Sequence, residues 1–293
     1  MHLDLMLFNY EDGGRRPDGT YAWEPLGTTV AAATPHLLVM NEAKLYANRG
    51  KQALYAAADA LHGHTGKMFI PLLCVSEHGP YPPAVFYQPE HLMVVQHYDE
   101  HPDNPQHERN LIVFRHLATN RILRVMPIHF DFQSGHNRFR EAELIGWTAD
   151  PAFATIVAGD FNSVSSRSQD AQRTFENCPS HKRYNKAQWI PHDDLRFGQP
   201  LKPDTRALDR LYDGGLLDVA ELAHEQGVAA DVAYMPTVNH GDSPLRIDRI
   251  LVSEPLRHAV DGATYQVHVP KGEPPSDHRA VSVRLQLARI TGT

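Results

Sequence analysis

The chain has 293 residues, a formal net charge of −7 and 42% hydrophobic residues. This length allows one large domain or two small ones, and the apolar fraction excludes a disordered protein because it can form a substantial core. The negative charge argues against bulk, sequence-independent binding of nucleic acid, although a local basic cleft is compatible with it. Cys74 and Cys178 lack metal-ligand spacing and do not amount to a disulfide framework.

The N-terminal stretch MHLDLMLFNYEDGG lacks the basic region and the long apolar stretch of a signal peptide. No run approaches the roughly 18 to 20 apolar residues of a membrane-spanning helix. We therefore expect a soluble, cytoplasmic protein with no membrane partner, and we expect it to be a monomer.

Short apolar runs predict strands along most of the chain. They cover residues 3–8, 36–40, 68–74, 91–96, 111–114, 122–128, 156–158, 245–252, 264–269 and 280–287. Helical patterns cover 53–61 and 138–149, and residues 216–224 suit either a short helix or a strand. Residues 11–25 are rich in Gly, Pro and Asp and predict a loop. No repeat or linker divides the chain, so we expect a single domain over residues 1–293.

A long polar insertion, about residues 164–204, interrupts this pattern. A loop of this length inside a compact domain is usually functional or partly disordered. Within it, the stretch SHKRYNKAQW concentrates His181, Lys182 and Arg183 beside aromatic residues. Such a segment could bind a phosphate and stack a base, and a solvated basic loop explains it equally well.

Residues 156–164 read IVAGDFNSV, a short apolar run that ends in a carboxylate and a carboxamide. Side chains alternate along a strand, so Asp160 and Asn162 are expected on one side while Phe161 enters the core. Their oxygens suit a hard cation, and the amide N–H suits a phosphate. The alternative is an Asx turn that only ends the strand.

Further polar residues lie at the ends of other predicted strands, where burial without a partner would cost free energy. They are Asn9, Glu42, His129 and Asp248, and the triplet Ser276-Asp277-His278 immediately precedes the last strand. Each alone has an ordinary structural explanation, such as a cap or a satisfied core histidine. If the strands share a sheet edge, however, these side chains converge.

In this order, the motifs NEA, PIHF, GDFN, IDRILVS and SDHRAV resemble those of the endonuclease/exonuclease/phosphatase superfamily. That superfamily has the fold of DNase I and of exonuclease III-type abasic-site endonucleases, and the resemblance covers nearly the whole chain. It implies a four-layer α/β sandwich, in which two mixed β-sheets pack face to face with helices outside. It places the active site at one edge, between the sheets.

The resemblance also implies hydrolysis of a phosphoester that depends on Mg²⁺ or Mn²⁺. Glu42 and Asp277 are the expected metal ligands, and Asn9 would position both metal and phosphate. Asp160 would orient or deprotonate the attacking water, which must be activated for this reaction, and Asn162 would donate to a phosphoryl oxygen.

Two histidines complete the expected catalytic set. His278 would bind the phosphate or act as acid or base, with Asp248 fixing its tautomer. His129 is a second candidate proton donor or phosphate ligand, and the sequence leaves open which histidine is the acid.

Two features depart from the family pattern. Many nucleolytic members have a Tyr or Arg contact between the Glu and His strands, and Tyr98, His107 and Arg109 are equal candidates for it here. The sequence NEAK replaces the commoner QE pair and leaves the metal-binding Glu intact.

Fold does not define the substrate, which is therefore a phosphodiester or phosphomonoester of either a small molecule or a nucleic acid. One alternative is a specialised-metabolism enzyme that uses the same metal site as a Lewis acid on a small molecule. A non-catalytic binding module is disfavoured because no member of the polar set is replaced.

Overall fold

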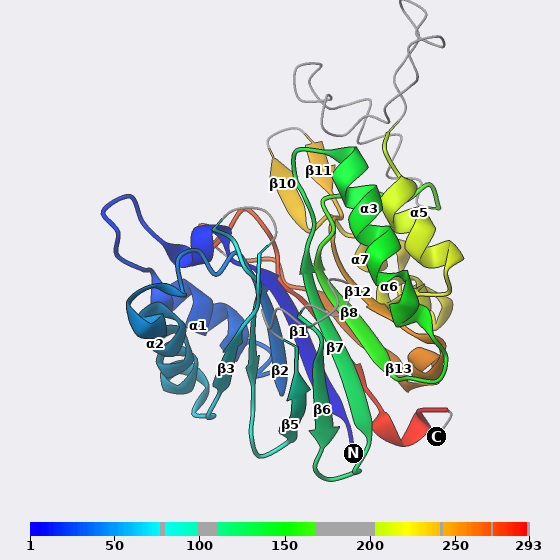
Figure 1. Cartoon of the computed structure of the whole chain (residues 1–293), viewed down its shortest axis with the longest axis horizontal. Coiled ribbons are helices and arrows are strands. Elements are labelled where there is room, and N and C mark those ends of the chain that lie inside the picture. Colours follow the sequence, from blue (N-terminus) through cyan, green and yellow to red (C-terminus); the bar gives the residue numbers. More distant parts are fainter. Residues whose placement is uncertain (77–79, 99–109, 168–202, 241–242, 271, 292–293) are drawn as a thin grey trace, which may run out of the picture.

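The computed structural model describes residues 1–76, 80–98, 110–167, 203–240, 243–270 and 272–291. Two six-stranded mixed sheets form its centre (Figure 1), and the expected four-layer α/β sandwich is confirmed. The first sheet has the order β13-β14-β1-β2-β4-β3 and the second the order β5-β6-β7-β8-β12-β9, with a separate β10–β11 hairpin.

The strands of the first sheet are β1 (Leu3–Asn9), β2 (Leu37–Asn41), β3 (Ile70–Leu73), β4 (Ala84–Tyr87), β13 (Val260–Val267) and β14 (Val281–Leu285). Those of the second are β5 (Leu92–His97), β6 (Ile112–His116), β7 (Ile122–His129), β8 (Thr155–Asp160), β9 (Leu217–Asp218) and β12 (Asp248–Val252). The hairpin joins β10 (Val238–His240) to β11 (Ser243–Leu245).

The central strands are apolar throughout because both of their faces are buried. In β1, Leu5 and Leu7 pack between the two sheets, whereas Met6 and Phe8 pack in a second cluster against helices. Alternation along the strand therefore supplies two cores at once.

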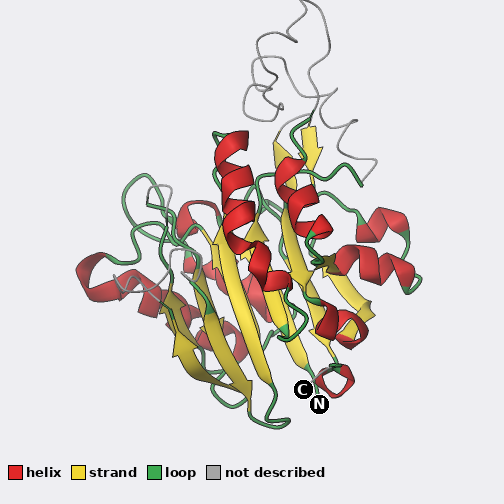
Figure 2. Ribbon diagram, turned by 45° about the vertical axis from the view of Figure 1, so that its right-hand side comes forward, coloured by secondary structure: helices red, strands yellow, loops and turns green. Residues whose placement is uncertain are grey.

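Helices cover the outer face of each sheet (Figure 2). Helices α1 (Trp23–Ala31) and α2 (Asn48–Thr65) pack on the first sheet, and α3 (Gly135–Ile145) and α5 (Arg206–Asp213) pack on the second. The other helices in the described residues are α6 (Val219–Glu225), α7 (Ala230–Ala233) and the 3-10 turns η1 (Glu11–Gly14), η3 (Gly146–Ala149), η6 (Glu254–Ala259) and η7 (Leu287–Arg289). Within the described ranges, none of the helices is long and apolar enough to cross a bilayer.

Three local expectations need correction. Residues 11–25 are not a continuous loop, because η1 forms there and α1 begins at Trp23. Pro25 and Gly27 conceal this helix in the sequence, yet Pro is well tolerated in a first helical turn. The four-residue strand β4 was not predicted, and residues 216–224 contain both β9 and the start of α6.

Strand register aligns the polar strand ends at one end of the sandwich. β1 runs parallel to β2 and pairs Asn9 with Asn41. β7 runs parallel to β8 and pairs His129 with Asp160, while antiparallel β12 brings Asp248 opposite the same Asp160. One polar row therefore crosses each sheet, and the two rows lie at the same end.

Candidate active site

Asp160 lies in the middle of the polar row in the second sheet. Its neighbour Gly159 makes this possible, because a Cβ on Gly159 would lie 1.8 Å from the backbone oxygen of Ile128. The glycine of GDFN thus permits a close approach of β8 to β7, which sets Asp160 beside His129.

One oxygen of the Asp160 carboxylate, Oδ2, faces groups from both sheets. Asn9 Nδ2 donates to it at 3.2 Å, and the Nε2 atoms of His129 and His278 lie 3.9 Å and 4.0 Å away. Burial, together with the charge of Asp248, raises the pKa of Asp160 to about 6. The structure therefore brings four of the predicted site residues around one buried carboxylate.

His278 and Asp248 form a second close pair. The ring nitrogen Nδ1 of His278 lies 2.7 Å from Asp248 Oδ2, so Nε2 is left to face Asn9 at 3.5 Å and Asp160. Burial opposes the charged imidazolium, but the carboxylates of Asp248 and Asp160 outweigh it and raise the pKa of His278. This arrangement fixes the ring and presents a proton donor to the centre of the site.

The GDFN segment forms an Asx turn and also directs a carboxylate oxygen toward the site, so both interpretations of its sequence apply. Strand β8 ends at Asp160, and Asn162 adopts a left-handed conformation with φ of 47°. Asp160 Oδ1 accepts a hydrogen bond from the Asn162 N–H at 2.7 Å, which is an Asx turn, while Oδ2 faces the site. The expected strand alternation at Asn162 was therefore wrong, whereas Phe161 is fully buried as expected.

The side chain of Asn162 is partly committed to the fold. Its Nδ2 donates to the backbone oxygen of Phe130 at 3.0 Å. An amide nitrogen carries two hydrogens, so one donor remains for a phosphoryl oxygen.

Asn41 is a residue that the sequence reasoning did not select. It is fully buried at the end of β2, accepts from the Asp160 N–H at 3.1 Å and donates to the Ile128 oxygen at 2.6 Å. The available signal was an amide next to Glu42 at a strand end, in the NEAK motif. Asn41 thus connects the first sheet to the Asp160 backbone in the second.

Acidic groups gather at the mouth of the site. Glu42, with φ of 64°, accepts from the Asp12 N–H at 2.8 Å. Burial and then the charges of Asp277, Glu42 and Asp12 raise the pKa of Glu11. Asn9 Oδ1 is buried and has no hydrogen-bond partner among the described residues. Crowded carboxylates and an unpaired amide oxygen together suit a hard cation.

Ser276 ties the SDH triplet to the end of β1. Its hydroxyl donates to the backbone oxygen of Asn9 at 2.8 Å and accepts from the backbone N–H groups of Glu11 and His278. This fixes Asp277 and His278 relative to Asn9, although Asp277 remains partly exposed.

Two groups of carboxylate and imidazole atoms in the described part of the chain are close enough to hold a metal ion. One is Asp160, Asp248 and His278, which lies in this site, and the other is His2, Asp4 and His36. In the second group, Asp4 already binds Arg284 through both oxygens. His36 Nδ1 accepts from the Asp4 N–H, which leaves the proton on Nε2 and removes that nitrogen as a ligand.

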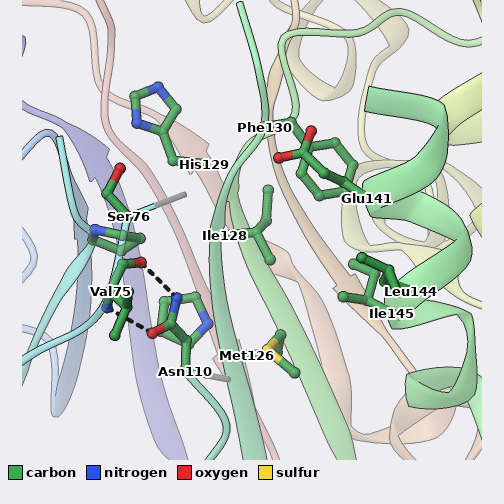
Figure 3. A pocket seen from close by; sticks show the side chains of 12 residues that line it. Val75, Ser76, Asn110, Met126, Ile128, His129, Phe130, Glu141, Leu144 and Ile145 are labelled. Carbon is green, nitrogen blue, oxygen red and sulfur yellow. Dashed lines mark hydrogen bonds between the residues drawn. The ribbon is translucent and has the colours of Figure 1, made fainter. Parts of the chain in front are cut away.

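A small pocket of about 70 Å³ adjoins His129, between β7, α3 and the segment after β3 (Figure 3). Asn110 holds Val75 there through two hydrogen bonds, which Figure 3 draws as dashed lines.

Tyr98 lies at the end of β5 and packs with the core cluster on the outer face of the second sheet. His107, Arg109, His181, Lys182 and Arg183 lie outside the described residues.

Comparison with known proteins identifies the family of the chain. The model of the Endonuclease/Exonuclease/phosphatase family matches residues 24–278. No curated protein matches the chain.

Solved structures share the fold at low sequence identity. An AP endonuclease from Archaeoglobus fulgidus has a TM-score of 0.60 and 16% identity, over 96% of this chain and 98% of that one. A 3′-5′ exonuclease, NExo, from Neisseria meningitidis has a TM-score of 0.59 and 17% identity, over 97% and 99%. Truncated TDP2 from Caenorhabditis elegans has a TM-score of 0.55 and 14% identity, over 97% of each chain.

Proposed function

This chain belongs to the endonuclease/exonuclease/phosphatase family, and we propose that it is a Mg²⁺- or Mn²⁺-dependent hydrolase of phosphoesters. One observation carries the proposal. Asp160 Oδ2 lies within 4.0 Å of Asn9 Nδ2 and of the Nε2 atoms of two histidines. A carboxylate surrounded by hydrogen-bond donors can hold and activate a water beside a phosphoryl group.

Glu42, Asp277 and the Oδ1 atom of Asn9 are the groups that would hold the ion. When bound, the ion would neutralise charge on the phosphoryl oxygens and on the oxygen that leaves. The negative charge at the mouth of the site favours such a cation: after burial, the carboxylates of Asp277, Glu42 and Asp12 are the groups that raise the pKa of Glu11.

The remaining residues act on the water and the phosphate. Asp160 orients or deprotonates the attacking water through Oδ2. His278, held by Asp248, donates a hydrogen bond to a phosphoryl oxygen or transfers a proton, and His129, whose Nε2 approaches the same oxygen of Asp160, is a second phosphate ligand or proton donor. Asn162 contributes its remaining N–H to the phosphate.

The substrate is a phosphodiester or a phosphomonoester. NExo of Neisseria supports both possibilities, since it is described as a 3′-5′ exonuclease, which cleaves a diester, and as a 3′ phosphatase bound to a product DNA hairpin, which cleaves a monoester. The net charge of −7 favours a substrate held by a local site over one held by overall attraction.

A panel of phosphodiesters and phosphomonoesters, assayed with Mg²⁺ and with Mn²⁺, tests the proposal. Activity should vanish in EDTA and return with either metal, and Glu42→Gln should remove most of it. Glu90→Gln is the matched control, because Glu90 is an exposed glutamate whose ion-pair partners among the described residues are Lys67 and His91. Full activity after exhaustive chelation would show that the proposed chemistry is wrong.

A further inference from the structure

A second pocket, of about 660 Å³, lies between the loop that follows η1 and the start of α2. Figure 1 places this loop and α2 together at one flank of the molecule. The size falls in the range of about 300 to 1,000 Å³ that is usual for small-molecule sites. A lone phosphate would leave most of it empty.

Positive charge is concentrated in the two segments that build this pocket. Residues 13–23 and 45–58 contain the cations Arg15, Arg16, Arg49 and Lys51 and one acid, Asp18, in a chain with 35 acidic and 28 basic residues. Among the side chains that line the pocket, the charged ones are Arg15, Arg49 and Asp18. Asp18 is occupied locally, since it accepts from the N–H and hydroxyl groups of Thr20.

The two lining arginines are available to a ligand. Neither Arg15 nor Arg49 forms an ion pair with any residue that the structure describes. Burial raises the pKa of the Tyr21 phenol, and the charges of Arg15, Arg49 and Lys44 act in the opposite direction. The three cations therefore act on one aromatic side chain of the pocket wall.

Part of the wall is aromatic. The rings of Tyr21 and Trp23 stack at 4.9 Å with 4° between their planes, and Tyr46 packs edge-on against both. The amides of Asn48 and Gln52 also line the pocket and are exposed. Arginine, aromatic rings and amides together are suited to a phosphate and a flat ring that bears polar groups.

One segment connects this pocket to the proposed metal ligand. Leu45 lines the pocket, and the Lys44 oxygen accepts from the Tyr21 hydroxyl at 3.0 Å. Glu42, the proposed metal ligand, lies in the same short segment and accepts a hydrogen bond from the Asp12 N–H. This four-residue segment therefore links the pocket, at Leu45, to the proposed metal ligand, Glu42.

We propose that this pocket binds a nucleoside phosphate unit, and that it holds the non-reacting end of a substrate with a second phosphate group. The binding claim stands alone, whereas its link to a substrate rests on the proposed function. Binding energy from a remote group can lower KM or raise kcat, depending on whether it is used in the transition state.

Calorimetric titration with adenosine 5′-monophosphate in EDTA tests the binding claim without catalysis. Wild-type protein and Asp160→Asn protein should bind the nucleotide alike. Arg15→Ala and Arg49→Ala should each weaken binding at least about tenfold, as expected for loss of a charge-assisted hydrogen bond. Arg140→Ala, which removes an exposed arginine from α3, is the matched control and should leave the affinity unchanged.

A failure of the pocket proposal can be told apart from a failure of the proposed function. Absent binding, or binding that survives both pocket substitutions, would overturn the pocket proposal even if the chain hydrolyses phosphoesters. Conversely, a chain without hydrolase activity can still show the predicted titrations.

The link to a substrate has its own measurement. Arg49→Ala should lower kcat/KM for a dinucleotide with a terminal phosphate and leave bis(p-nitrophenyl) phosphate, which lacks a second phosphate, unaffected. An equal loss on both substrates would contradict the assignment of this pocket to the remote phosphate.

Discussion

Asn41 joins the backbone of Asp160 to the opposite sheet: its Oδ1 atom accepts from the Asp160 N–H at 3.1 Å. The same side chain donates to the Ile128 oxygen at 2.6 Å, so one buried amide binds the ends of both β7 and β8. The position of the central carboxylate therefore depends on contact between the sheets as well as on its own strand.

Asn41→Ala should impair both stability and turnover. It would leave a buried N–H and a buried carbonyl without partners, at a cost of about 2 kcal/mol or more in the free energy of unfolding. Because Asp160 loses its anchor, kcat should also fall at least tenfold. Urea unfolding and phosphoester hydrolysis measured on one preparation would show both effects.

Gln88→Ala is the control for this substitution. Gln88 is also a buried amide, and it donates to the Pro35 oxygen at the other end of the sandwich. The Gln88→Ala variant should be less stable than the wild type and should keep the wild-type kcat. If Asn41→Ala behaves in the same way, Asn41 has only a structural role.

The pairing of His278 with Asp248 predicts a shared effect on catalysis. His278→Ala should lower kcat by at least the roughly hundredfold typical of a lost acid or base. Asp248→Asn should also lower kcat, because the His278 ring loses the carboxylate that lies 2.7 Å from Nδ1 and fixes its tautomer. Circular dichroism should show that both variants fold.

His116→Ala provides the comparison for this pair. His116 is a buried histidine that shares a hydrogen bond with the Thr119 hydroxyl. It lies at the end of β6 that is remote from His129. Its removal should leave turnover intact, and a folded His278→Ala variant with near wild-type kcat would refute the assignment.

The free energy of unfolding should decrease as the pH is lowered because of His36, which stacks on His91 with ring centroids 3.7 Å apart. Burial, and then the charges of His91, His2 and His116, lower the pKa of His36 to about 4, while Asp4 opposes them. A histidine with a pKa below its ordinary 6.5 binds protons better when the chain is unfolded. Its contribution is therefore complete above pH 6.5 and is lost as the pH falls toward 4.

Urea unfolding at several pH values would measure this loss, which is on the order of 3 kcal/mol for a shift of this size. His36→Asn keeps an acceptor for the Asp4 N–H and should flatten the pH dependence. His258→Asn, at an exposed histidine, should not change it. An unchanged slope in His36→Asn would show that other groups dominate acid sensitivity.

Much of the site was predictable because strand ends carry its residues in chain order. Apolar runs indicated the strands that end at Asn9, His129 and Asp160, and the family motifs indicated which sheet edge they share. The sequence offered no comparable signal for Asn41, since its partners are backbone groups 87 and 119 residues away in the chain.

Other features depend on tertiary contacts that no local pattern encodes. The strand β4 has only four residues and is stabilised by pairing with both β2 and β3. Strand β8 ends at Asp160, and the left-handed backbone at Asn162 breaks the expected alternation, although asparagine is among the residues that tolerate this conformation. The pocket beside α2 arises from two segments that appeared as an ordinary loop and an ordinary helix.

The central claim is that Asp160 acts on the reaction and does more than form a turn. Asp160→Asn keeps the oxygen that the Asn162 N–H requires and removes a buried charge that is disfavoured next to Asp248. Thermal melting and turnover should be measured on the same preparation. We predict an unchanged or higher Tm with a severe loss of kcat, because the lost charge acts in the transition state. A variant that melts at a lower temperature and still turns over would contradict the account and leave Asp160 as a turn residue.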